Sequence, residues 1–96
     1  VSAVGQIYSL SDANTFLEMY VTRNNSTYDI VLNINGGNNN SGGTALNLGG
    51  TTLVDVTDTS NVKVKFATSS MGGSSQLFGD TSSNYTYFTF IRLGDT

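Results

Sequence analysis

The chain has 96 residues, a length that suits one domain. It contains no His and no Cys, which excludes a Ser-His or Cys-His nucleophile pair, a disulfide, and a zinc site built on imidazole or thiolate. We therefore expect neither an enzyme nor a bound cofactor. The net charge of −3, with only Lys63 and Lys65 close together among four basic residues, also counts against nucleic acid as a partner.

Apolar residues are frequent enough for a folded core. Leu, Ile, Val and Phe make up roughly a quarter of the chain, above the level of disordered segments. No apolar run approaches the roughly 18 residues of a membrane span, and no basic stretch precedes an apolar one, so we expect neither membrane insertion nor a signal peptide. Because the first residue is Val1 rather than Met, we expect a processed chain or the C-terminal part of a longer protein.

The first half of the chain predicts a short strand and then a hairpin. A strand is expected over Val4–Leu10 and at most one helical turn over Ser11–Thr15. Alternating residues over Phe16–Thr22 and Tyr28–Ile34, joined by a polar turn, predict a β-hairpin. The alternation places Glu18 and Asp29 toward solvent, and it assigns four residues of the second strand to one face: Tyr28, Ile30, Leu32 and Ile34.

The middle of the chain predicts a second hairpin between two loops. The loops are Asn35–Thr44 and Ser69–Ser75, with a short strand at Ala45–Leu48 after the first. The hairpin pairs Thr52–Thr57 with Asn61–Thr68 across a turn at residues 58–61, and it directs Lys63 and Lys65 to solvent.

After a short strand at Gln76–Phe78, the closing segment Asn84–Leu93 has the strongest strand pattern, with large apolar groups on both faces. We therefore expect both faces to be covered. Five to eight short antiparallel strands over residues 1–96 predict an all-β fold, either a small antiparallel β-sandwich or an open barrel. A small, glycine-rich core is thin, so self-association along the last strand is expected.

Two groups of acidic residues have the spacing of a chemical site. Glu18 and Asp29 lie on the two arms of the first hairpin, where a carboxylate pair could flank a glycosidic bond, but solvent-facing positions explain them better. Asp55, Asp58 and Asn61 surround a turn and offer oxygen ligands for calcium, but turn-forming Asp and Asn explain them better. We therefore predict no catalytic site and no metal site.

The asparagines and tyrosines are the best candidates for ligand binding. An exposed Tyr can stack on a sugar ring, and an Asn amide offers a donor and an acceptor to sugar hydroxyls. Turn and loop positions place seven such residues at the surface: Asn24, Asn25, Tyr28, Asn38, Asn39, Asn40 and Tyr85.

The closing segment, residues 84–96 with the sequence NYTYFTFIRLGDT, resembles the C-terminal receptor-binding tip of a bacteriophage tail fibre. The composition of the whole chain, rich in Gly, Ser, Thr and Asn and without Cys or His, is similar to that of such tips. The resemblance implies a homotrimer at the end of an extracellular virion fibre that binds a host polysaccharide or outer-membrane protein. Two other readings stay open: a carbohydrate-binding or adhesin-like module of a bacterial surface protein, and a structural piece of a virion without a ligand.

Overall fold

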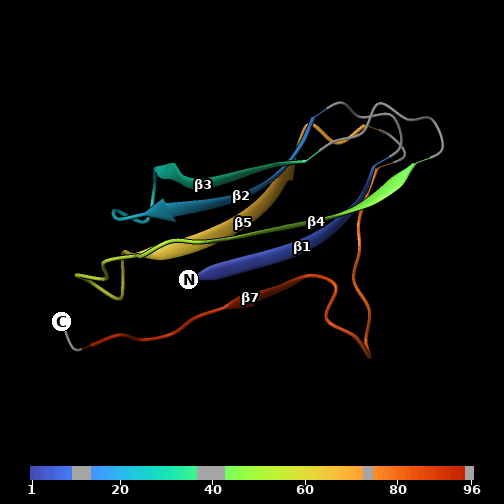
Figure 1. Ribbon diagram of the computed structural model, residues 1–96. Coiled ribbons are helices and arrows are strands. Elements are labelled where there is room, and N and C mark those ends of the chain that lie inside the picture. The colour runs from blue at the N-terminus through green and yellow to red at the C-terminus, as the bar shows by residue number, and fades with distance from the viewer. Residues whose placement is uncertain (10–13, 37–42, 73–74, 95–96) are drawn as a thin grey trace.

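The computed structural model describes residues 1–9, 14–36, 43–72 and 75–94 (Figure 1). This part of the chain is all-β, with two antiparallel sheets and no helix. The strands, in chain order, are β1 (Ser2–Ser9), β2 (Thr15–Thr22), β3 (Tyr28–Gly36), β4 (Thr44–Thr51), β5 (Lys63–Ser69), β6 (Gln76–Leu77) and β7 (Tyr87–Thr89). The prediction of an all-β fold is confirmed, and the two sheets form a sandwich rather than a closed barrel. No helix among these residues is long and apolar enough to cross a membrane.

Each sheet has one central strand. In sheet A, β1 lies between β4 on one side and β6 and β7 on the other. In sheet B, β2 lies between β3 and β5. The turn between β2 and β3, the start of β1 and the segment that follows β7 all lie at the same end of the molecule (Figure 1).

The core lies between the two central strands. Sheet A contributes Ala3 and Ile7 from β1 and Leu48 from β4, and sheet B contributes Leu17 and Met19 from β2. Neighbouring strands of both sheets add half-buried side chains around this cluster. With so few fully buried residues, each of them carries a large share of the hydrophobic stabilisation.

The first hairpin is confirmed, but a β-bulge changes one of its faces. β2 and β3 pair over their full length, and the register shifts between Met19 and Tyr20, so that Val31 is an extra residue in β3. Leu32 therefore packs against the core, whereas Ile30 is 51 % exposed. The expectation that Tyr28, Ile30, Leu32 and Ile34 share one face is wrong, because the extra residue reverses the alternation between them.

The prediction of a second hairpin is wrong. β5 forms as expected, but it pairs with β2 rather than with Thr52–Thr57. Residues 52–57 are not in a strand, although they follow directly from β4. The predicted turn at residues 58–61 does form: the amide of Ser60 donates to Asp58 Oδ1 at 2.8 Å, and Asn61 Nδ2 donates to Asp58 Oδ2 at 2.5 Å. The expected exposure of Lys63 and Lys65 is confirmed.

The closing strand is much shorter than its pattern predicts. Only Tyr87–Thr89 pairs with β1, and the residues on either side leave the sheet. Phe88 stacks on Phe66 with ring centroids 3.8 Å apart and closes one side of the sandwich. Ile91 and Leu93, however, are 70 % and 78 % exposed. The expectation that both faces of this segment are covered is therefore wrong for the single chain.

Three short strands were predicted at Val4–Leu10, Ala45–Leu48 and Gln76–Phe78, and they are confirmed as β1, β4 and β6. The predicted helical turn over Ser11–Thr15 and the first predicted loop, Asn35–Thr44, lie mainly outside the described residues. Thr15 itself begins β2 and donates a hydrogen bond from its hydroxyl to the Gly36 carbonyl at 2.6 Å.

Gly43, just before β4, has a φ of 77°, which L side chains rarely adopt. A Cβ at this position would also overlap the hydroxyl of Tyr8. We expect Gly43→Ala to lower the free energy of unfolding by about 1–3 kcal/mol in a urea titration. Gly79→Ala is the control, because an added Cβ there meets nothing within 4 Å. Equal stability of the two variants would contradict this interpretation.

Candidate functional site

The outer side of sheet B is the best candidate for a binding surface, because aromatic, cationic and amide groups gather on it. Tyr20 of β2 lies opposite Ile30 of β3 and Lys65 of β5 in the hydrogen-bond register. Two residues closer to the hairpin turn, Thr22 of β2 lies between Tyr28 of β3 and Lys63 of β5. We call this surface the sheet B face; it consists of Glu18, Tyr20, Tyr28, Ile30, Asn33, Lys63 and Lys65.

Lys65 lies between two tyrosine rings at the centre of the sheet B face. Its Nζ is 4.4 Å from the centroid of the Tyr20 ring and 4.7 Å from that of Tyr28. Both distances are within the range of a cation–π interaction, worth about 0.5–1 kcal/mol at an exposed position. The two rings thus hold the Lys65 side chain against the sheet, although Lys65 as a whole stays exposed to solvent.

A buried carboxylate supports this arrangement. Glu18 is only 7 % exposed, contrary to the expectation that it faces solvent freely. Its Oε2 accepts a hydrogen bond from the Tyr20 hydroxyl at 2.6 Å, and its Oε1 accepts one from Ser69 Oγ at 2.8 Å. Charge-assisted bonds of this kind fix both partners, so Glu18 orients the Tyr20 ring on which Lys65 rests. Asp29 lies opposite Val21, and the two acids do not meet across the hairpin.

The hairpin turn beside the sheet B face uses its two asparagines in different ways. Asn24 Oδ1 accepts hydrogen bonds from the amides of Ser26 and Thr27, both at 2.9 Å, and its Nδ2 donates to the Thr27 hydroxyl at 2.7 Å. Asn24 therefore builds the turn. Asn25 has a φ of 57°, and its Oδ1 accepts a hydrogen bond from Lys63 Nζ at 2.5 Å. Asn25 thus ties the turn to the first lysine of β5.

The seven predicted binding residues do not all come together. Asn24, Asn25 and Tyr28 lie at the hairpin end of sheet B, and Tyr28 is 37 % exposed. Tyr85 is also exposed, but it precedes β7, which belongs to sheet A (Figure 1). Asn38, Asn39 and Asn40 lie outside the described residues. Tyr20 and Lys65 were missed as site residues, because only the pairing of β2 with β5 brings them together.

Metal binding finds no support within the described ranges. No group of three acidic, His or Cys side chains there is placed to hold an ion. Asp58 of the predicted calcium cluster instead accepts the hydrogen bonds that form its own turn. The turn-forming explanation of Asp58 and Asn61 is therefore the one that the geometry favours.

Hydrogen bonding to Glu18 raises the pKa of the Tyr20 phenol above its ordinary value of 10.0; burial and the negative charge of Glu18 act in the same direction. Because the folded pKa is the higher one, this stabilisation is complete below about pH 10 and is lost as the pH rises through the folded pKa. We expect Glu18→Gln to shift the Tyr20 midpoint to lower pH in an NMR titration of the ring resonances. An unchanged midpoint would contradict the assignment.

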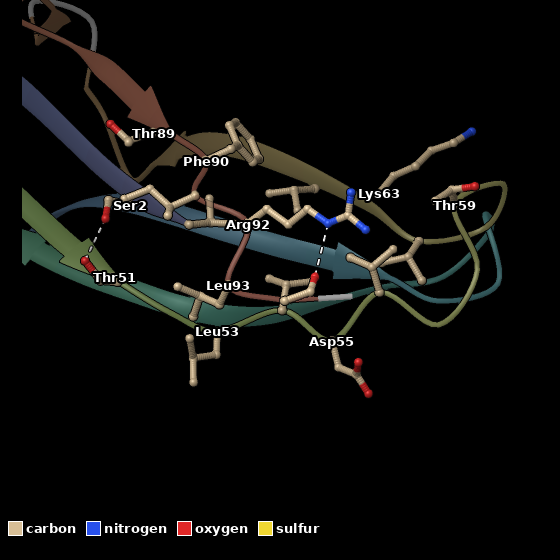
Figure 2. Close-up of a pocket in the computed structure, with 17 residues that line it drawn as sticks. Ser2, Thr51, Leu53, Asp55, Thr59, Lys63, Thr89, Phe90, Arg92 and Leu93 are labelled. Carbon is tan, nitrogen blue, oxygen red and sulfur yellow. Dashed lines mark hydrogen bonds between the residues drawn. The ribbon is translucent and has the colours of Figure 1, made fainter. Parts of the chain in front are cut away.

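A second candidate surface is an apolar groove at the end of the molecule where the turn between β2 and β3 lies. It has a volume of about 1080 Å³ and runs between residues 53–56, which follow β4, and residues 90–94, which follow β7 (Figure 2). Val62 and Val64 of the β5 region also line it. Three charged side chains belong to its lining: Asp55, Lys63 and Arg92.

No known protein family, curated protein or solved structure matches this chain. The geometry of the sheet B face and of the apolar groove is therefore the basis for assigning a function.

Proposed function

We propose that this chain is a receptor-binding domain that recognises a polysaccharide on a bacterial surface, as the extracellular tip of a bacteriophage tail fibre. The observation that carries the proposal is the placement of Lys65 between the rings of Tyr20 and Tyr28 on the sheet B face. Binding rather than catalysis is favoured, because the one buried carboxylate there already accepts two hydrogen bonds and has no acidic partner opposite it.

The chemistry of the sheet B face suits a sugar chain. Tyr28 offers a ring for stacking, and Lys65 and Asn33 offer hydrogen-bond donors to ring hydroxyls. The strands beneath are rigid, since β2 is the buried central strand of its sheet. A rigid platform with few mobile groups loses little entropy when an extended polymer binds.

Three exposed apolar residues that line the apolar groove support self-association as part of this function. Leu53, Ile91 and Leu93 are each at least 70 % exposed. A cluster of large exposed apolar side chains marks an interaction surface in a soluble protein. A homotrimer would cover them and present three copies of the sheet B face, which raises the avidity for a repeating polysaccharide.

The proposal is tested by adsorption of purified protein to bacterial cells of candidate host strains and to their extracted polysaccharides. We expect Lys65→Ala and Tyr28→Ala each to weaken binding by about tenfold or more, the effect of losing one charge-assisted hydrogen bond or one stacked ring. Tyr85→Ala is the matched control, since Tyr85 is similarly exposed but belongs to the other sheet. Equal weakening by all three variants, or by none, would overturn the proposal.

A further inference from the structure

The two lysines of the sheet B face have no ion-pair partner. Lys63 and Lys65 lie two residues apart on β5, so their side chains leave the same side of the sheet. Within the part of the chain that the structure describes, no carboxylate forms an ion pair with either of them. Because the chain as a whole has a net charge of −3, the two lysines are a local feature of this surface rather than a result of the composition.

The acidic residues of sheet B, Glu18 and Asp29, do not neutralise these lysines. The carboxylate of Glu18 is buried, and its two oxygens accept hydrogen bonds from Tyr20 and Ser69. Asp29 pairs with Val21, whose side chain is fully buried on the core side of the sheet, so Asp29 belongs to that side and not to the sheet B face. Both lysines are therefore available to a negative charge from outside the chain.

The Lys65 ammonium does not have the position of a lysine that only protects a sheet edge. β5 is an edge strand, and a lysine on such a strand can prevent pairing with another chain by its charge at the edge. Lys65 instead extends across β2: its Nζ lies 4.4 Å from the ring centroid of Tyr20 and 4.7 Å from that of Tyr28 on β3. The ammonium thus lies over the middle of sheet B, where a ligand on this surface meets it.

An anionic group suits this ammonium better than a hydroxyl. A lysine ammonium has three N–H donors, and the two tyrosine rings replace part of its water shell. A hydrogen bond between a charged donor and a charged acceptor is about twice as strong as one between neutral groups. Lys63 adds a second positive charge beside it, and its Nζ is held at the hairpin turn by the hydrogen bond to Asn25 Oδ1 at 2.5 Å.

We propose that the sheet B face selects an acidic polysaccharide, whose carboxylate or phosphate groups bind the ammonium groups of Lys65 and Lys63. This inference rests on the proposed function and names the class of polysaccharide that the site takes. A nucleic acid is the weaker choice of anionic ligand, because only two lysines lie on this face and a surface that follows a phosphate backbone has a larger basic cluster.

The test compares three forms of the polysaccharide extracted from a bacterial strain that the protein adsorbs to: native, carboxyl-reduced with carbodiimide and borohydride, and dephosphorylated with hydrofluoric acid. Isothermal titration calorimetry on the full chain gives the dissociation constants. We expect one of the two treatments to weaken binding about tenfold or more, which identifies the anionic group as carboxylate or phosphate. Added salt should weaken binding of the native form, because salt screens exposed charges.

Lys65→Met connects this effect to the site, because methionine keeps an unbranched side chain and removes the charge. The variant should bind the native and the neutralised polysaccharide equally, and it should fold, because Lys65 is exposed. Arg23→Met is the matched control. Arg23 is exposed in the turn between β2 and β3 and is not part of the sheet B face, so this variant should keep the preference for the native form.

Four results would overturn the inference. If both treated forms bind as tightly as the native one, the anion plays no part, and the proposed function still stands where Tyr28→Ala weakens binding. If Lys65→Met keeps the preference for the native form, the anion binds elsewhere on the molecule. Tighter binding of oligothymidylate than of the native polysaccharide would make the ligand a nucleic acid. Binding of no form of the polysaccharide would remove the proposed function together with this inference.

Discussion

Replacing Leu17 with alanine should lower the free energy of unfolding by about 2–5 kcal/mol, the range for truncating a buried leucine. Leu17 is only 1 % exposed and lies on β2, the central strand of sheet B, in the core cluster between the sheets. A chain of this length has a total stability of about 5–14 kcal/mol, so one substitution removes a large part of it. We expect the melting temperature to fall by about 10–30 °C in a calorimetric scan.

Ile30→Ala is the matched control for the core, because it also truncates an aliphatic residue of sheet B, but one that projects outward. Its effect should stay below about 1 kcal/mol, the span of β-strand propensities. Similar losses from the two substitutions would show that the core does not lie between the two sheets as described.

The second large effect concerns self-association. If Ile91 and Leu93 form the contact between copies, a double variant with Ile91→Asp and Leu93→Asp should dissociate the assembly, because charges cannot be buried in an apolar interface without partners. The solution mass by light scattering should fall from about 31 kDa, three times the chain mass, to 10.2 kDa. Folding should be retained, since both side chains are exposed in the single chain.

A control with the same added charge separates this effect from general repulsion. Thr57 and Thr81 are exposed and lie outside the lining of the apolar groove, so Thr57→Asp with Thr81→Asp should leave the mass unchanged. A wild-type mass of 10.2 kDa would contradict self-association directly, and the exposed residues would then need another explanation.

Local sequence patterns predicted most of the strands, but they predicted a correct pairing only where the two strands are close in the chain. The hairpin of β2 and β3 follows from alternation on both arms and a polar turn of five residues. The same reasoning failed at Thr52–Thr57 and Asn84–Leu93, where the alternation is as clear. A pattern of alternating residues shows that a segment can be extended, but it does not show whether a partner strand is present.

The sheet B face could be predicted only in part, for a similar reason. Tyr28 and Asn25 were found because a turn exposes them, whereas the site also needs Lys65, 37 residues after Tyr28 in the chain. Lys65 meets Tyr20 through the non-local pairing of β2 with β5. The β-bulge at Val31 has no local signature either, yet it decides which side chains of β3 face outward.

The most direct test of polysaccharide recognition is an NMR map of backbone amides during titration with polysaccharide extracted from a bacterial strain that the protein adsorbs to. The proposed function predicts chemical-shift changes over Tyr20, Tyr28, Asn33 and Lys65 on the sheet B face, with β1 and β4 of sheet A unchanged. Changes confined to sheet A, or none at saturating polysaccharide, would contradict it.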